Sequence, residues 1–377
     1  MSWLFRRRIR VIPGVRLNLS KSGVTASIGV RGASITLGGK GGTYANVGIP
    51  GTGIYSRRKI GGGKNSIFDN PSEKRVHPQE YEEQISQPDE VFVSEDPLDI
   101  TSDGLMALQE AVLAANKQKI QLKKDLTEIK TSIFTTQLLK LISQLTLLYY
   151  LLPFIKRKLN SNLASMQKAT EEVKQGINQS VVELELEMEE EARNAFEELI
   201  PSFQELGKSN YVWDITSATD VDQVRTRSAA SSTLERERAS LRQDKLPGIT
   251  SSYNALCFSN INGADIYLYP GFVVMYNNPE NFGILEITNV EASFEVSNFL
   301  EIESIPNDSE QVGEVWEKTN KDGSRDKRFS DNRQIPVMRY GEITLRSNTG
   351  IYEKYMFSNA ELAENFVSQL NKFQDLI

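Results

Sequence analysis

Apolar residues alternate with polar ones over the first part of the chain, between residues 14 and 58. The first run has Val15, Leu17 and Leu19 at its apolar positions, and residues 24–28 and 33–37 repeat the pattern. Alternation of this kind is typical of short β-strands. Glycine tolerates the positive φ angles of tight turns, and glycines recur every nine residues, at Gly14, Gly23, Gly32 and Gly41. Residues 1–60 are therefore predicted to form a small Gly-rich β-meander.

The period changes to that of a helix near Asp103, a residue type that often caps helices. Apolar residues then recur three or four positions apart in two runs, Leu105, Leu108 and Val112, and then Leu122, Leu126, Ile129 and Ile133. A second helical pattern covers residues 160–179 and weakens at Gly176. We therefore expect two long antiparallel helices, a helical hairpin over residues 105–180.

The two helices are joined by the most apolar stretch of the chain, LISQLTLLYYLLPFIKRK, from Leu141 to Lys158. Its leucines continue a seam with spacings of three and four, but Leu139, Ile142 and Leu147 make the flanks apolar as well. A helix that is apolar nearly all round is either deeply buried or in lipid. The uncharged run 141–155 would be about 22 Å long, shorter than a hydrocarbon core of about 30 Å. Pro153 predicts a turn just before the cations that follow.

This stretch is therefore predicted to be a hairpin tip that meets the bilayer interface without spanning it. The cations at its end suit anionic lipid headgroups. The residues expected in contact with the membrane are Leu141, Leu145, Leu148, Tyr149, Tyr150, Leu151, Leu152, Phe154, Ile155, Lys156, Arg157 and Lys158. The alternative is that the same residues pack inside a helical bundle or oligomer.

Residues 181–245 are expected to connect the hairpin to the rest of the chain. Alternation from Val182 to Met188 predicts a strand whose glutamates form a solvated face, and a helical pattern follows from Glu189 to Leu206. The charged, Ser-rich segment from Arg225 to Lys245 is predicted to be a surface loop or an exposed helix.

Strand patterns dominate residues 246–377, and a last amphipathic helix carries Leu362, Phe366, Leu370 and Phe373 on one face. About seven antiparallel strands followed by a helix resemble a pleckstrin-homology-like barrel. The expected fold class is thus α+β: a small Gly-rich β-meander, a long helical hairpin, and a C-terminal antiparallel β-barrel closed by a helix. A possible ligand loop in this region contains Arg325, Lys327, Arg328 and Arg333. Its alternative is local pairing of these cations with Asp322, Asp326 and Asp331.

Charge is separated along the chain. The net charge is −7, but residues 1–60 contain eleven Arg and Lys and no Asp or Glu. Such asymmetry favours an anionic partner. The cations expected to bind an anionic surface are Arg6, Arg7, Arg8, Arg10, Lys21, Lys40, Arg57, Arg58 and Lys59. The alternative is that the basic module docks on its own acidic remainder. Residues 61–104 are acidic and contain several prolines, which predicts a flexible linker.

The first module also resembles a known family. The segments PGVRLNLSKSGV, RGASITLG and GIPGTGIYSRR are similar to those of the bacterial domain of unknown function numbered 4236. The resemblance covers residues 1–58. It implies a bacterial protein with a small β-domain and carries no known activity.

Catalytic and metal-binding patterns are sparse. The chain has one histidine, His77, in the predicted linker, and one cysteine, Cys257. Nucleophilic catalysis by Ser or Cys needs a base held on a rigid scaffold, and a thiolate zinc site needs more cysteines. We therefore expect no enzymatic activity and no cofactor.

The leading hypothesis is a cytoplasmic protein that associates peripherally with membranes through the hairpin tip and the basic module. A hairpin stored in a bundle and released onto a bilayer resembles α-helical pore-forming toxins, which suggests an effector against phage or competitors. A soluble oligomeric scaffold that binds protein partners or itself is the first alternative. The second is nucleic-acid binding through residues 1–60, which would weaken steeply with salt.

Overall fold

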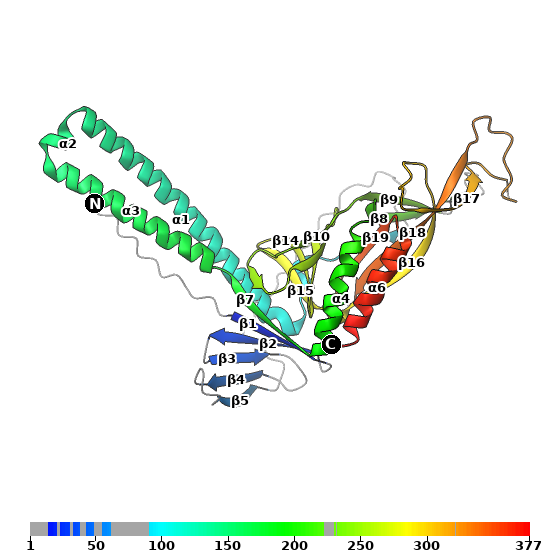
Figure 1. Cartoon of the computed structure of the whole chain (residues 1–377), viewed down its shortest axis with the longest axis horizontal. Helices are drawn as coiled ribbons and strands as arrows, with labels where there is room; N and C mark the ends of the chain where they lie inside the picture. The colour runs from blue at the N-terminus through cyan, green and yellow to red at the C-terminus, as the bar shows by residue number, and fades with distance from the viewer. Residues whose placement is uncertain are drawn as a thin grey trace, which may run out of the picture.

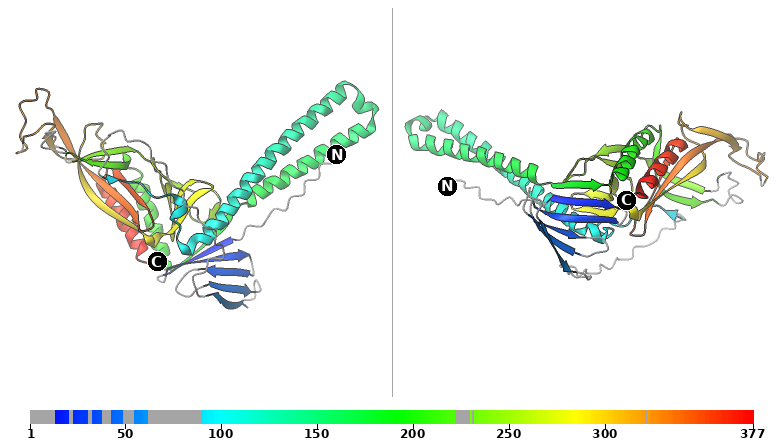
Figure 2. Two further views of the ribbon diagram at one scale, coloured as in Figure 1. Left: turned by 180° about the vertical axis from the view of Figure 1, so that it is seen from behind. Right: turned by 60° about the horizontal axis from the view of Figure 1, so that its bottom comes forward.

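The structure is a computed structural model that describes residues 14–20, 23–30, 33–37, 43–48, 55–61, 90–221, 230, 232–320 and 322–377. Helices and antiparallel sheets both contribute substantially, as the predicted α+β class requires. A long helical hairpin projects from a body of sheets and shorter helices, and both further views show the same projection (Figures 1 and 2).

The N-terminal sheet contains the predicted meander. Its strands β1 to β5 pair antiparallel in chain order, and their bounds are Gly14–Ser20, Gly23–Val30, Ala33–Leu37, Thr43–Gly48 and Tyr55–Gly61. Two distant strands extend this sheet in parallel: β7 (Val182–Met188) pairs with β1, and β11 (Ile249–Ser251) pairs with β7. Val15 and Leu17 of β1 are buried in the main core of the body. The basic module is thus attached to the body through its first strand.

The helical hairpin consists of α1 (Met106–Leu145), the single turn α2 (Leu148–Leu151) and α3 (Pro153–Gln179). With 40 residues, α1 is about 60 Å long. Side chains of α1 pack in two separate apolar clusters. The root of α1, with Leu105 just before it, belongs to the main core, whereas the outer part has a small cluster of its own, formed by Leu122, Ile129, Met166, Ala169 and Val173.

Two buried amides fasten the root of α1 to the body. Gln109 Nε2 donates to the Phe282 carbonyl at 2.7 Å, and Asn116 Nδ2 donates to the Pro279 carbonyl at 2.9 Å. Gly248 adopts a positive φ of 91° directly beside Asn116, where a Cβ would lie 2.5 Å from the amide oxygen. The hairpin therefore leaves the body from a tightly packed base.

Two open antiparallel sheets make up the rest of the body. One has the order β10-β12-β13-β14-β15, with bounds Leu241–Asp244, Ala255–Phe258, Asp265–Tyr269, Phe272–Asn278 and Asn281–Glu286. The other has the order β16-β18-β19-β8-β6, with bounds Val290–Leu300, Gln334–Ser347, Tyr352–Phe357, Val212–Asp220 and Glu90–Val91. In this second sheet β17 (Glu310–Trp316) also pairs with β18, and β9 (Ser232–Arg238) pairs with β8.

Aromatic side chains join the two sheets and two covering helices. Phe258 lies 5.3 Å from Tyr355 of the other sheet, ring centre to ring centre. Helices α4 (Glu190–Leu206) and α6 (Ala360–Gln374) run side by side (Figure 1), and Phe203 contacts both Phe258 and Phe366. The prediction of a single closed barrel over residues 246–377 is wrong, because the described strands form two separate sheets and recruit β6, β8, β9 and β10 from outside that range.

A strap, residues 90–105, runs across both sheets before α1 begins. The Phe92 amide donates to the Thr216 carbonyl at 3.0 Å, and the Ser102 amide donates to the Ile284 carbonyl at 2.9 Å. It includes the short 3₁₀ turns η1 (Pro97–Asp99) and η2 (Asp103–Leu105). Residues 62–89 of the predicted linker lie outside the described residues. From residue 90 onward the linker prediction fails, because Phe92 and Ile100 are buried.

The charged segment before residue 245 also differs from its prediction. It contains the strands β9 and β10 rather than a loop or helix. The cause is Arg236, which points inward: its guanidinium binds both oxygens of the buried Glu301 at 2.8 and 2.9 Å and lies 4.3 Å from the ring centre of Trp213. An inward-facing arginine hides the alternation that would reveal a strand.

Candidate functional site at the hairpin tip

The tip, residues 138–158, reverses the chain within a few residues. Helix α1 ends at Leu145, and Leu147 adopts the left-handed conformation with φ of 61°. Leu152 is extended and Pro153 is the first residue of α3. Proline disfavours helical geometry in the residue before it and suits the first turn of a new helix. The proline thus places the turn where the sequence predicted it.

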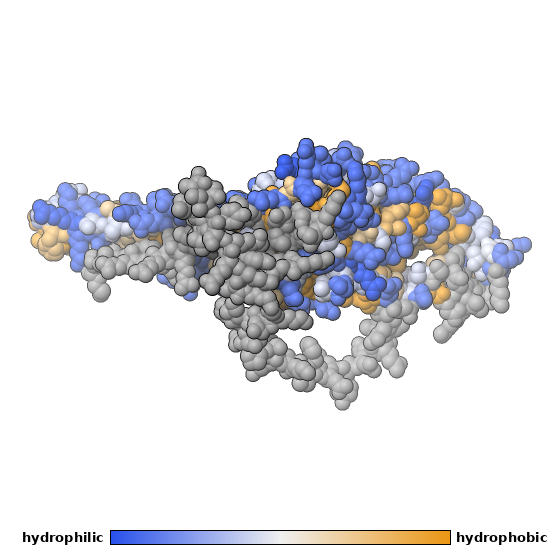
Figure 3. Space-filling model, turned by 90° about the horizontal axis from the view of Figure 1, so that it is seen from below, coloured by the Kyte–Doolittle hydropathy of each residue, from blue (hydrophilic) through white to orange (hydrophobic). Residues whose placement is uncertain are grey.

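Large apolar side chains cover the outside of the tip. Leu145 is 77% exposed, Leu151 72%, and Tyr150 65%. The other exposed apolar residues at this end of the hairpin are Phe134, Leu138, Leu139, Leu141, Ile142, Leu147, Leu148 and Phe154. The space-filling view shows apolar residues gathered at the end of the hairpin, far from the body (Figure 3).

Beyond the apolar cluster of the outer hairpin, small polar residues take buried positions of α1 that leucines usually occupy. Thr136 and Ser143 of α1 are buried, and their hydroxyls donate to carbonyls of their own helix at 2.8 and 2.7 Å. Such local hydrogen bonds satisfy a buried hydroxyl within its own helix, and the Thr136 hydroxyl also lies 3.9 Å from Met166 Sδ of α3. The end of the hairpin is therefore inverted relative to a water-soluble helix pair, because α1 buries hydroxyls and exposes leucines there.

Tyr149 departs from the predicted contact set. It is only 7% exposed, because it is enclosed at the base of the tip: the Nζ atoms of Lys140 and Lys156 each lie 5.7 Å from its ring centre, and Asn160 Nδ2 donates to its hydroxyl at 3.1 Å. Leu152 and Ile155 are half-buried. The other predicted contact residues, including Lys156, Arg157 and Lys158, are exposed.

Cations surround the base of this apolar surface. From residue 129 to residue 170 the chain has no Asp or Glu and six cations, Lys130, Lys140, Lys156, Arg157, Lys158 and Lys168. Lys140 lies five residues before Leu145, which is about 8 Å along the helix. Amphipathic helices at membrane interfaces bury their apolar faces by about 5–10 Å. We call the exposed apolar residues from Leu141 to Phe154 the apolar cap, and Lys140, Lys156, Arg157 and Lys158 the collar. The cap and the collar have the dimensions of a contact with a membrane interface. None of the helices in the described part of the chain is both long enough and apolar enough to cross a bilayer.

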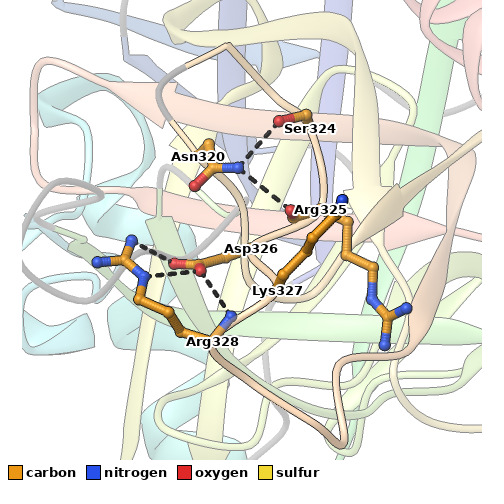
Figure 4. Close-up of a pocket in the computed structure, with 6 residues that line it drawn as sticks. All are labelled: Asn320, Ser324, Arg325, Asp326, Lys327 and Arg328. Carbon is orange, nitrogen blue, oxygen red and sulfur yellow. Dashed lines mark hydrogen bonds and ion pairs between the residues drawn. The ribbon is translucent and has the colours of Figure 1, made fainter.

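The possible ligand loop at the opposite end of the molecule is less well organised. Asn320, Ser324, Arg325, Asp326, Lys327 and Arg328 line a pocket of about 740 Å³ beside β17. Arg328 binds both oxygens of Asp326, at 2.9 and 2.7 Å, and Arg333 binds Glu317 at 3.1 Å. Arg325 lies over the Trp316 ring and extends to the opposite side of the loop from Arg328 (Figure 4). These cations diverge, and two of the four are paired with carboxylates, so the loop presents no single anion site.

Of the cations of the first module predicted to bind an anionic surface, three lie in the described part of the chain. Arg57, Arg58 and Lys59 lie on β5, at the edge of the sheet farthest from β7. The remaining six, Arg6, Arg7, Arg8, Arg10, Lys21 and Lys40, lie outside the described residues. The glutamates of β7 are exposed, as predicted, and β7 lies between β1 and β11.

The sequence comparisons bear on the first module. Residues 3–57 match the model of the family DUF4236, which is described as a protein of unknown function. This confirms the resemblance drawn from the segments quoted above, over nearly the same residues. No curated protein and no solved structure gives a significant match to the chain. The family match therefore covers the Gly-rich module and leaves the hairpin and the body to be interpreted from their own geometry.

Proposed function

We propose that this protein is a non-enzymatic, peripheral membrane-binding protein whose hairpin tip inserts shallowly into the interface of an anionic bilayer. One observation carries the proposal: the end of the helical hairpin holds a cluster of exposed leucines and aromatics, with cations at its base, away from the body. Exposed apolar patches of this kind mark interaction surfaces, and the cations favour an anionic one.

Magnitudes support a bilayer as the partner. Full burial of one leucine or aromatic side chain contributes about 1.5–3 kcal/mol. Five side chains at the tip are at least 60% exposed: Leu145, Leu147, Tyr150, Leu151 and Phe154. Each Lys or Arg near an anionic surface adds about 1 kcal/mol. Because the folded hairpin already positions these groups, little ordering cost opposes their insertion.

Flotation of the full chain with vesicles containing anionic lipid tests the proposal. We expect the wild type to float and the double variant Leu145→Glu, Leu151→Glu to remain at the bottom of the gradient. Both positions are exposed, so the charges cost little in folding. Ile302→Glu is the matched control, since Ile302 is 64% exposed and belongs to the body. Equal flotation of the wild type and the double variant would show that the tip does not bind the membrane. Release of an entrapped dye would extend it to membrane perturbation.

A second candidate, self-association into an oligomeric scaffold, is favoured by the spacing of four exposed residues on α1. Phe134, Leu138, Leu141 and Leu145 recur with the three–four spacing of a coiled-coil seam. Gln137 and Gln144, which flank this seam, are uncharged and would not repel a second copy. Light scattering without lipid separates the two candidates. An oligomer that Phe134→Glu, Leu138→Glu dissolves supports the scaffold, and a monomer that floats with vesicles supports membrane binding.

A further inference from the structure

A group of buried polar side chains lies at the junction of the two body sheets, far from the hairpin tip. Asp214 of β8 and Glu353 of β19 have no exposed surface, although both are carboxylic acids. Tyr355 pairs directly with Asp214 across the β8–β19 ladder, and Glu353 is two residues before Tyr355. Because side chains two residues apart on a strand share a face, all three point to the same side of the sheet.

Several atoms in this group have no hydrogen-bond partner within the protein. They are Asp214 Oδ1, Glu353 Oε2, the Tyr355 hydroxyl and Asn260 Nδ2. Tyr355 is completely buried, so its hydroxyl has no direct access to solvent. Buried polar atoms are nearly always paired, and four orphaned atoms in one place mark an incomplete network. In the described part of the chain no three His, Cys, Asp or Glu side chains are arranged to hold a metal ion.

A proton on one of the two carboxyls would supply a hydrogen-bond donor that this network lacks. Burial raises the pKa of Glu353 to about 7, and repulsion from Asp214 acts in the same direction. Burial also raises the pKa of Asp214, with a further contribution from Glu237. The hydrogen bonds that Ser94 donates lower the pKa of Glu353 in part, and Asn260, which is also neutral, acts in the same direction. Asp265 acts on Tyr355 and is itself bound to Arg242 at 2.6 Å. No cation is among the groups that act on Glu353.

Glu353 also holds the strap. Its Oε1 accepts hydrogen bonds from the Ser94 amide at 3.2 Å and the Ser94 hydroxyl at 2.6 Å. The same hydroxyl accepts a bond from the Tyr352 amide at 3.1 Å. Asp214 Oδ2 accepts from the Ile261 amide at 2.8 Å, and Asn262 Nδ2 donates to the Phe92 carbonyl at 2.8 Å. Glu353 thus fastens the strap directly, whereas Asp214 holds the turn whose Asn262 bonds to the strap, and the strap leads directly into the root of α1.

We propose that Glu353 and Asp214 form a buried proton-binding site that clamps the strap across the two sheets when it holds a proton and loosens the strap when it is empty. A protonated Glu353 carries no charge beside Asp214 and has a hydrogen to donate within the group of orphaned atoms. When both carboxyls are ionised, two negative charges lie buried without a counterion. Local opening of the strap then exposes Glu353 to water and relieves the repulsion.

The direction of the pH effect follows from linkage. The pKa of Glu353 is raised in the folded state, so its stabilising contribution is fully present below the ordinary value of 4.5 and is lost as pH rises to about 7. Between these values each pH unit increases the equilibrium for opening by up to about tenfold. Above about pH 7 the opening equilibrium levels off.

Hydrogen exchange of the full chain in solution, without lipid, tests this proposal independently of membrane binding. After correction for intrinsic exchange rates, we expect protection of strap amides such as Ser94 to fall by up to about tenfold per pH unit between pH 5 and 7. In Glu353→Gln, which keeps an acceptor for Ser94 but does not titrate, the protection should be independent of pH. Amides of β13 and β14 serve as the internal reference.

Asp214→Asn provides a second test that does not alter Glu353. Removal of the neighbouring charge should shift the midpoint of the pH dependence downward, while the amide oxygen still accepts the Ile261 bond. The same pH dependence in the wild type and in Glu353→Gln, or none in the wild type, would overturn the proposal. A midpoint unchanged by Asp214→Asn would remove Asp214 from the site.

Discussion

Leu147 is the one residue other than glycine with a positive φ in the described part of the chain. The left-handed conformation costs a residue with a Cβ about 1 kcal/mol, and glycine is the usual choice there. Packing does not repay this cost, because Leu147 is 60% exposed. An exposed leucine in an unfavourable conformation supports selection for contact with an apolar partner rather than for stability.

Replacement of Leu147 by glycine should therefore increase the stability of the hairpin and weaken its binding to membranes. In Leu147→Gly we expect slower hydrogen exchange at the ends of α1 and α3, corresponding to about 0.5–1 kcal/mol of added stability, because glycine relieves the strained turn. Flotation with anionic vesicles should weaken, because an apolar side chain is lost. A variant that gains stability and floats as well as the wild type would show that Leu147 does not contact lipid.

Gly283 of β15 illustrates a close approach that no local pattern signals. A Cβ there would collide with the Pro97 carbonyl and lie 2.7 Å from Ile100 Cγ1, both in the strap. We expect Gly283→Ala to lower the free energy of unfolding by about 1–3 kcal/mol, because overpacking displaces the strap. Gly313→Ala is the matched control, since no atom lies within 4 Å of the position that the new Cβ would take. Urea unfolding midpoints measure the difference, and equal midpoints would contradict this account.

At the residue scale, the sequence identifies the tip but not the orientation of its side chains. Spacings of three and four show that Leu138, Leu141 and Leu145 share a face, but not whether that face meets α3. The structure places Thr136 and Ser143 inside instead. Tyr149 belongs to the same apolar run, yet only its position between Lys140 and Lys156 explains its burial. Periodicity defines faces, and tertiary packing decides which one is buried.

At the scale of the element, the outer hairpin depends on a core of its own. Its small cluster is separate from the main core, and Val173 at its centre is fully buried. Elements with few buried contacts open locally before the whole protein unfolds. The outer hairpin is therefore expected to open locally while the body remains folded.

Val173→Ala tests this separation. Loss of two buried methyl groups should cost about 1–3 kcal/mol, and we expect the cost to appear as faster hydrogen exchange in α3 and the outer part of α1. Amides of β13 and β14 should keep their wild-type protection. Matched destabilisation in both regions would mean that the hairpin and the body unfold as one unit.

Local patterns predicted most elements but missed those stabilised by distant partners. The strand β7 and the helix α4 follow from alternation and from helical periodicity. The strap resembles a linker in its proline and its acids, and becomes ordered because Phe92 and Ile100 reach two separate sheets. The strand β9 carries an inward-facing Arg236 whose partner, Glu301, is 65 residues away. Such pairings are not visible in any local window.

At the scale of the whole molecule, the arrangement of the sheets is the part that the sequence could not supply. Counting strands in residues 246–377 suggested a barrel, but closure depends on which edges meet, and alternation does not encode that. The parallel pairing of β1 with β7 likewise joins residues more than 160 positions apart, as in Val15 with Leu184. Because Val15 and Leu17 belong to the main core, removal of residues 1–60 would uncover β7 and is unsuitable for testing the role of the basic module.

Charged residues are distributed unevenly over the molecule, which would affect its orientation at an anionic membrane. The net charge is −7, yet residues 129–170 carry only cations. At physiological salt, interactions between exposed charges are screened beyond about 8 Å. The collar around the tip should therefore attract an anionic surface only when the tip points toward it. Acidic residues predominate from 171 onward and disfavour orientations that bring that part of the chain to the surface.

Neutralising the collar should consequently weaken binding in proportion to the charge removed. Three exposed cations, Lys156, Arg157 and Lys158, lie just after the apolar cap. At about 1 kcal/mol each, their replacement by glutamine should reduce the affinity for anionic vesicles by about 100-fold. The affinity for neutral vesicles should not change.

The control triple variant Lys117→Gln, Lys123→Gln, Lys124→Gln removes the same charge from exposed positions nearer the root of α1. Lys124 is about 30 Å from Leu145 along the helix, so we expect this variant to bind like the wild type. Equal losses in the two variants would show that net charge, rather than the collar, governs attachment.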